Sequence, residues 1–151
     1  MKPPAWRLAR DVYPYATEIQ TRYRDEDMLR HVNNMAIADY YDEARNRFSR
    51  AIFKAAGDIT GMRLVNVENA VNFLAEVHHP DTLTVGSGIL SISNQAYVIG
   101  QALFQKGACV GTCDTVFVRA SRSRGASALP DNLRTVLESF RLRTPDDVTL
   151  A

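Results

Sequence analysis

The chain has 151 residues and a mass of 16.9 kDa, a length typical of one domain that can bury a full hydrophobic core. Hydrophobic residues make up 46% and charged residues 23% of the sequence, which excludes a disordered or fibrous protein. The formal net charge of +1 gives no general attraction to nucleic acid or membranes, so a charged partner would have to be bound by a local cluster.

Residues 1–15 are expected to form an irregular lead-in, because Pro3, Pro4 and Pro14 interrupt regular pairing. This stretch has no apolar core of the kind found in secretory signals. The chain also lacks the run of about 18 apolar residues that a transmembrane helix requires. These observations favour a cytoplasmic protein.

The next two elements follow from hydrophobic periodicity. Residues 16–24 alternate between two faces, which predicts a half-buried strand. Residues 35–56 carry apolar side chains at spacings of three and four, which predicts a long amphipathic helix. Asn33 or Asn34 is a suitable N-cap for this helix, and Gly57 is a suitable stop.

The remainder of the chain predicts four strands, at 64–77, 82–93, 96–105 and 108–119, and a short helix at 130–140. Two glycines within residues 86–88 suggest a bulge or sharp bend, and Lys106 with Gly107 suggests a hairpin turn. The last two strands carry apolar or small residues on both faces, so both faces of that part of the sheet should be covered.

Strands joined by short turns must be antiparallel, so the element order predicts an α+β fold in which one long helix packs on an antiparallel sheet of about five strands. We expect a single domain over residues 16–140 and a tail over 141–151. Cys109 and Cys113 fall on one predicted strand, where they would lie about 13 Å apart. A disulfide needs Cα atoms within about 7 Å, so two free thiols are expected.

Polar residues cluster before the long helix. Three consecutive acids, Asp25, Glu26 and Asp27, precede a His-Val-Asn-Asn turn that starts at His31. A helix N-terminus presents free N–H groups that can bind an oxyanion, and an acid nearby could act as a general base or nucleophile. The alternative is structural, because acids favour the positive end of a helix dipole and Asn is a common cap.

The segment 22–45 resembles the signature of hot-dog-fold acyl-CoA thioesterases, the 4-hydroxybenzoyl-CoA thioesterase-like group. The residues that carry this resemblance are Arg22, Tyr23, Asp25, Asp27, His31, Val32, Asn33, Asn34, Tyr40 or Tyr41, Glu43, Ala44 and Arg45. The resemblance implies a hot-dog fold, in which the sheet wraps the long helix and two subunits pair with active sites at their interface. It implies a homodimer or a dimer of dimers, and hydrolysis without a metal or redox cofactor.

The resemblance also assigns roles around the helix start. Asp27 falls at the position of the family's catalytic carboxylate, and the backbone N–H of Asn34 falls at the oxyanion position. His31 is expected to orient the loop rather than transfer a proton, and Asn33 is expected to brace the turn beside the substrate. Asp25 is interpreted as a structural acid. Arg30 replaces the family's glycine, so it either changes the loop or adds charge at the entrance to the site.

Two further assignments stay open between function and structure. Glu43 is a second choice for the catalytic carboxylate, because some hot-dog thioesterases use an acid of the helix; its spacing also permits an ion pair with Arg47. Three arginines near the last strand could bind the phosphates of coenzyme A, or they could simply form a solvated basic loop. They are Arg119, Arg122 and Arg124.

The sequence therefore leads us to expect a thioesterase that hydrolyses an acyl-CoA or aroyl-CoA to free acid and thiol. One alternative is a hot-dog domain that binds acyl-CoA or lipid without turnover. Another is a thioesterase that acts on the acyl carrier protein of a biosynthetic pathway.

Overall fold

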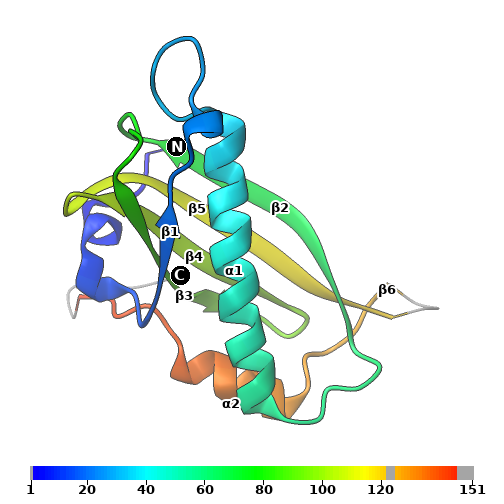
Figure 1. The fold of residues 1–151 in the computed structure, drawn as a ribbon. Coiled ribbons are helices and arrows are strands. Elements are labelled where there is room, and N and C mark those ends of the chain that lie inside the picture. Colours follow the sequence, from blue (N-terminus) through cyan, green and yellow to red (C-terminus); the bar gives the residue numbers. More distant parts are fainter. Residues whose placement is uncertain (1, 122–124, 146–151) are drawn as a thin grey trace.

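The computed structural model describes residues 2–121 and 125–145 and shows one antiparallel sheet with a long helix packed across it (Figure 1). The helices are α1 (Asn34–Ala56) and α2 (Asp131–Ser139). The strands are β1 (Tyr15–Gln20), β2 (Arg63–Phe73), β3 (Thr82–Ile92), β4 (Ala96–Gln105), β5 (Ala108–Ser121) and the short β6 (Gly125–Ala126). Single 3-10 turns span Ala5–Leu8, Arg10–Val12 and Tyr23–Asp25.

The sheet follows the order β1-β3-β4-β5-β2, and β6 pairs with β5. Every pair of neighbouring strands is antiparallel, as the short connections predicted. β1 and β2 are the two edges of the main path, and β2 is the longer of the two. The α+β hot-dog architecture expected from the sequence is therefore confirmed.

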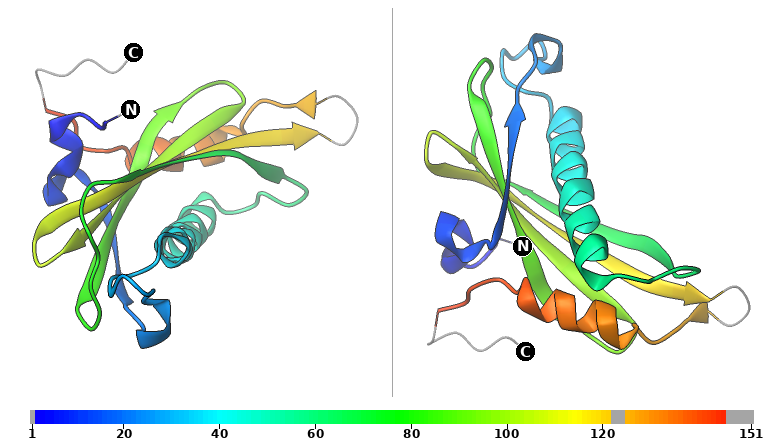
Figure 2. Two further views of the ribbon diagram at one scale, coloured as in Figure 1. Left: turned by 90° about the horizontal axis from the view of Figure 1, so that it is seen from above. Right: turned by 60° about the horizontal axis from the view of Figure 1, so that its bottom comes forward.

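The sheet curves around α1, which packs on β1, β3 and β4 and meets α2 near its C-terminal end (Figure 2). The face of α1 that points to the sheet buries a stripe of apolar side chains at helical spacing. They are Ala36, Ile37, Tyr40, Tyr41, Ala44, Phe48 and Ile52. These residues form two apolar clusters with the strands and α2. Burial of this stripe is what holds a helix of this length in place.

The opposite face of the sheet is covered by the chain's own ends, as the apolar character of β4 and β5 predicted. Tyr13 and Leu142 pack against Phe104 on this face, and the buried guanidinium of Arg7 pairs with Asp114 at 2.7 Å. The N-terminal turns therefore lie on the side of the sheet away from α1 (Figure 2).

The expected bulge at residues 86–88 is wrong. The register of β3 and β4 is regular there and shifts only between Ile89 and Ser91. The glycines provide room instead, because a Cβ on Gly86 would lie 2.7 Å from Tyr13 Cβ and one on Gly88 would lie 2.5 Å from Leu142 Cδ2.

The predicted elements otherwise match, with earlier ends for two strands. The strand expected over 16–24 ends at Gln20, and the one expected over 64–77 ends at Phe73. Lys106 and Gly107 form the predicted hairpin turn with φ of 51° and 80°. Both cysteines are free thiols. Within the described residues, no helix is long and apolar enough to cross a membrane.

Candidate active site at the start of the long helix

Asp25 anchors the loop that leads into α1. Its buried carboxylate accepts two hydrogen bonds from Arg22, at 2.9 Å from Nε and 3.1 Å from Nη2, and one from the Tyr40 hydroxyl at 2.6 Å. Its carbonyl oxygen accepts from the backbone N–H of Asn33 at 2.8 Å. Both carboxylate oxygens are engaged in these contacts, which favours the interpretation of Asp25 as a structural acid.

The balance of these contacts sets the charge state of Asp25. Burial alone would raise the pKa of this carboxyl, but the hydrogen bonds from Arg22 and Tyr40 outweigh burial and lower the pKa below its usual value. Burial and the bond to Asp25 raise the pKa of Tyr40, which keeps the hydroxyl protonated as a donor. The anchor is therefore an ionised carboxylate with three donors.

Asp27 lies two residues further along the same loop and is half-buried. Its Oδ1 accepts the backbone N–H of Leu29 at 2.9 Å, and its carbonyl oxygen accepts the N–H of Arg30 at 3.0 Å. No donor to its Oδ2 is found in the described part of the chain. Arg30 adopts a φ of 62°, the left-handed region that glycine favours, so the loop keeps this geometry without glycine.

α1 begins with free backbone donors. The side chain of Asn33 caps the helix by accepting the N–H of Met35 at 2.7 Å. The backbone N–H of Asn34, the first helical residue, has no acceptor among the described residues. The N-cap is therefore Asn33, and the donor expected to bind an oxyanion is available.

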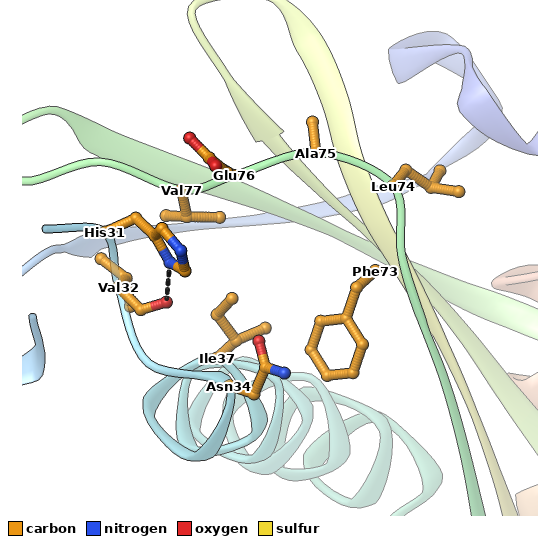
Figure 3. A pocket seen from close by; sticks show the side chains of 9 residues that line it. All are labelled: His31, Val32, Asn34, Ile37, Phe73, Leu74, Ala75, Glu76 and Val77. Carbon is orange, nitrogen blue, oxygen red and sulfur yellow. Dashed lines mark hydrogen bonds between the residues drawn. The ribbon is translucent and has the colours of Figure 1, made fainter. Parts of the chain in front are cut away.

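A pocket of about 250 Å³ opens beside Asn34 (Figure 3). The side chains of Ile37, Phe73 and Val77 border it, and the His31 ring stands across it from Phe73. The side chains of Leu74, Ala75 and Glu76 point away from it in this view. The lining residues are His31, Val32, Asn34, Ile37 and residues 73–77. The ring of His31 has its Nδ1 3.4 Å from the carbonyl oxygen of Val32. This site can hold a small apolar group next to free N–H donors.

The structure brings His31 and Asn34 together in this pocket but places the two candidate carboxylates elsewhere. Asp27 lines an adjacent hollow with Arg24, Met28 and Arg30. Glu43 lies on the flank of α1 that faces β1 and forms an ion pair with Arg47 at 3.0 Å.

Of the three predicted phosphate ligands, only Arg119 can be described. Its Nη1 donates to the carbonyl oxygen of Ala128 at 2.6 Å, which ties β5 to the segment before α2. Arg122 and Arg124 lie outside the described residues.

Sequence reasoning missed two contributions to this site. Tyr40 was noted only as part of a motif, and its bond to Asp25 could have been suspected from their shared place in that motif. Residues 73–77 also line the pocket, and the sequence offered one indication of this. Phe73 is a large apolar residue in an alternating strand, and its side chain is 50% exposed in the fold.

Comparisons with known proteins agree with this architecture. The model of the thioesterase-like superfamily matches residues 14–137. The PA5185 protein of Pseudomonas aeruginosa strain PAO1 is 24% identical, with 91% of this chain and 99% of that chain covered and a TM-score of 0.75. A thioesterase from Thermus thermophilus, solved with coenzyme A and Zn, is 22% identical over 86% of this chain and 96% of that one, with a TM-score of 0.73.

A third similar structure is Slr0204, a 1,4-dihydroxy-2-naphthoyl-CoA thioesterase from Synechocystis. It is 20% identical, with 82% of this chain and 94% of that chain covered and a TM-score of 0.69. At these identities the structural likenesses establish the fold. A search of curated proteins found no match.

Proposed function

The chain belongs to the thioesterase-like superfamily, and on that premise we propose that it hydrolyses an acyl-CoA or aroyl-CoA thioester to free acid and thiol. The observation that carries the proposal is the backbone N–H of Asn34, which has no described acceptor and belongs to a residue that lines the pocket. A thioester needs such a place, because its carbonyl oxygen becomes an oxyanion when it is attacked.

The start of α1 supplies the stabilisation. The Asn34 N–H donates to the developing oxyanion, and the positive end of the helix dipole favours the same charge. The apolar walls around Ile37 and Phe73 exclude water and thereby strengthen both interactions. The pocket holds the acyl or aroyl group, and no metal or redox cofactor takes part.

Asp27 is proposed as the carboxylate that drives the attack. It either activates water as a general base or attacks the carbonyl directly to form an anhydride. The thioester carbonyl is proposed to lie beside the loop of His31 and Val32, where the Asp27 carboxylate and the Asn34 N–H can both reach it. Label found in Asp27 after single-turnover hydrolysis in isotopically labelled water would exclude a pure general-base route, because only the anhydride can pass the water oxygen to Asp27.

The site is proposed to form at the interface of a homodimer, or within a dimer of dimers. Among the described residues β2 is an edge of the sheet, and its Val67 and Phe73 are 57% and 50% exposed. Closed symmetry is the common way to cover such an edge. Arg119, Arg122 and Arg124 are proposed to meet the coenzyme A phosphates. Their joint replacement by Ala should raise KM for acyl-CoA more than it changes kcat on a truncated thioester, and equal effects on both would contradict this role.

Free-thiol release from short, long and aromatic acyl-CoAs tests the activity, with wild type and Asp27→Asn measured in parallel. Asp58→Asn is a matched control, because Asp58 also accepts a backbone N–H two residues ahead, from Thr60 at 2.9 Å. We expect turnover to fall by about two orders of magnitude or more in Asp27→Asn and to stay unchanged in Asp58→Asn.

The other outcomes are equally decisive. Turnover retained in Asp27→Asn would exclude Asp27 and move the test to Glu43→Gln. Absence of turnover on every ester, by protein that is folded and dimeric, would overturn the thioesterase proposal.

A further inference from the structure

The pocket of the proposed thioester site is bordered by two connecting segments. Residues 21–33, the Asp27 loop, join β1 to α1, and residues 74–81 join β2 to β3. Both segments are largely irregular, so the contacts between them set their separation. One contact lies at the pocket, where Val32 and Val77 are side by side (Figure 3) and the Val32 N–H donates to the Val77 carbonyl oxygen at 2.7 Å.

The ring of His79 makes a second contact, at the other end of the Asp27 loop. Its Nδ1 lies 3.2 Å from Thr21 Oγ1, which is a hydrogen-bond distance. The same ring meets the ring of Tyr23 edge-on, with centroids 6.3 Å apart and an interplanar angle of 70°. Thr21 is 1% exposed, and Tyr23 lines the same hollow as Asp27. One side chain of residues 74–81 thus contacts the first and third residues of the Asp27 loop.

The direction of the bond between Thr21 and His79 follows from the other partner of the hydroxyl. Thr21 Oγ1 lies 2.9 Å from the carbonyl oxygen of Asp81, which can only accept, so the hydroxyl donates its single proton there. Oγ1 is left as an acceptor, and His79 Nδ1 must be the donor. The ring therefore gains or loses its second proton at Nε2. Because protonation there leaves Nδ1–H in place, the bond to Thr21 persists in both charge states.

The backbone on either side of His79 is restrained by β4 and the turn that follows it. The side chain of Gln105, which is 7% exposed, accepts from the His78 N–H at 3.0 Å and donates to the His78 carbonyl oxygen at 2.7 Å. Lys106 forms an ion pair with Asp81 at 3.2 Å. The His79 ring thus projects from a fixed piece of backbone, and a fixed donor can position the loop that accepts from it.

We propose that His79 is a positioning residue for the thioester site. Its bond to Thr21 and its contact with Tyr23 hold the start of the Asp27 loop against residues 74–81, while the backbone bond at the pocket holds the end of the loop. The two restraints together fix where the Asp27 carboxylate lies relative to the pocket. This inference rests on the proposed function, and it assigns His79 to the geometry of the site and not to proton transfer.

Thiol release by His79→Ala and His79→Asn tests the role. Ala removes the donor, whereas the Asn amide nitrogen is bonded to Cγ, as Nδ1 is in His, and can donate to Thr21. A carboxylate that is misplaced by about 1 Å loses rate without losing substrate affinity. We expect kcat to fall about tenfold or more in His79→Ala, with KM within about twofold of wild type, and to recover largely in His79→Asn.

His78→Ala is the matched control. His78 is the preceding residue, and its exposed ring lies 3.5 Å from the Glu76 carboxylate. Its loss should leave kcat unchanged. An unchanged kcat in His79→Ala would overturn the proposal, and an equal loss of kcat in His79→Asn would show that the bond to Thr21 does not position the loop.

A pH profile separates positioning from proton transfer. If His79 transferred a proton, the kcat profile of His79→Asn would lose an ionisation between about pH 5 and 8, the range in which histidine titrates. Since the bond to Thr21 persists in both charge states, we expect the profile of His79→Asn to keep the shape of the wild-type profile. A lost ionisation would overturn the positioning role.

Amide hydrogen exchange tests the restraint without a thioester. The N–H groups of Val32 and Asn33 bond to the carbonyl oxygens of Val77 and Asp25, at 2.7 and 2.8 Å. Their exchange should become about tenfold faster in His79→Ala and stay unchanged in His78→Ala. An unchanged rate at the fully buried Leu103 of β4 would show that the fold is intact.

The exchange measurement also separates the two proposals. Unchanged exchange at Val32 and Asn33 in His79→Ala would overturn the positioning role, whatever the activity. Failure of the wild type to hydrolyse any thioester would contradict the proposed function, while the exchange rates would still decide whether His79 holds the Asp27 loop.

Discussion

Arg30 occupies a backbone conformation that side chains with a Cβ disfavour. Its φ of 62° lies in the left-handed region, and the resembling family has glycine at this place. Substitution Arg30→Gly should therefore relieve strain and raise the free energy of unfolding by about 0.5–1 kcal/mol, since the greater flexibility of unfolded glycine offsets part of the gain.

Urea denaturation of wild type, Arg30→Gly and Arg24→Gly measures this effect. Arg24 lies in a 3-10 turn, where glycine relieves nothing and should lower stability. A loss of stability in Arg30→Gly comparable to that in Arg24→Gly would contradict the strain argument. Thiol release by Arg30→Gly also reports whether the extra positive charge beside Asp27 contributes to the site.

The Asp25 anchor makes stability depend on pH. The folded pKa of Asp25 is below its value in the unfolded chain, so its contribution is fully present above about pH 4 and is lost as the pH falls through the folded pKa. Substitution Tyr40→Phe removes one of the hydrogen bonds that oppose the effect of burial on the Asp25 carboxyl. The folded pKa of Asp25 should rise, and acid unfolding should begin at a higher pH.

Acid titration followed by circular dichroism checks this shift, and denaturation at pH 7 should show a loss of about 2 kcal/mol, typical of a hydrogen bond to a charged group. The double variant with Asp25→Asn provides the control. Against the Asp25→Asn background, Tyr40→Phe should no longer move the acid limit. A shift of equal size in both backgrounds would show that Tyr40 acts through some other group.

At the scale of elements, periodicity made α1 and the strands predictable. The stripe from Ile37 to Ile52 is long enough to outweigh local preferences, and the alternation in β2 to β5 is similarly sustained. Strand ends were less predictable, because Thr21 continues the alternation of β1 while the chain turns to bring Asp25 to Tyr40. The bulge predicted at the glycines of β3 is absent for a related reason. These glycines make room for Tyr13 and Leu142, which are distant in the sequence.

The candidate site was predictable in part. The acids and the helix start are neighbours in sequence, so their meeting needed no tertiary information. The far wall of the pocket is set by Phe73, and the burial of Arg45 is set by β4 and β5. Such contacts depend on how the sheet closes over the helix, and no local pattern encodes them.

Asn33 links the loop to α1 as an element. Its side chain caps the helix, and its backbone N–H donates to the carbonyl oxygen of Asp25. These two bonds fix the position of the backbone N–H of Asn34. Asn33→Ala should lower the free energy of unfolding by about 1 kcal/mol through loss of the cap. Asn33→Asp keeps the cap and should stay within about 0.5 kcal/mol of wild type.

Urea denaturation together with thiol release separates the two roles of Asn33. If the cap positions the oxyanion donor, kcat should fall in Asn33→Ala and recover in Asn33→Asp while both proteins remain folded. Equal kcat in the two variants would limit Asn33 to a role in stability.

For the whole molecule, the coverage of the sheet restricts where a second copy can bind. The face away from α1 is already covered by the N-terminal turns and Leu142, and β1 is a short edge. β2 is an 11-residue edge whose side chains are mostly exposed or half-exposed. Further apolar residues are exposed in the loop before α1 and in its first turn. Met28, Leu29 and Met35 are 94%, 67% and 76% exposed. This distribution favours pairing through β2.

A charge placed on that edge tests the pairing. Val67 lies at the irregularity of β2 and is 57% exposed, so Val67→Lys should leave the folded chain intact and oppose edge-to-edge contact. Glu18→Lys places a lysine on the opposite edge, in β1, as the matched control. Light scattering should find a dimer for wild type and Glu18→Lys and a monomer for Val67→Lys.

If the thioester site forms between subunits, thiol release should fall with the loss of dimer and return at protein concentrations that restore it. An active wild-type monomer at assay concentration would mean that one chain holds the complete site, and Asp27 and Asn34 of that chain would then have to reach the same thioester carbonyl.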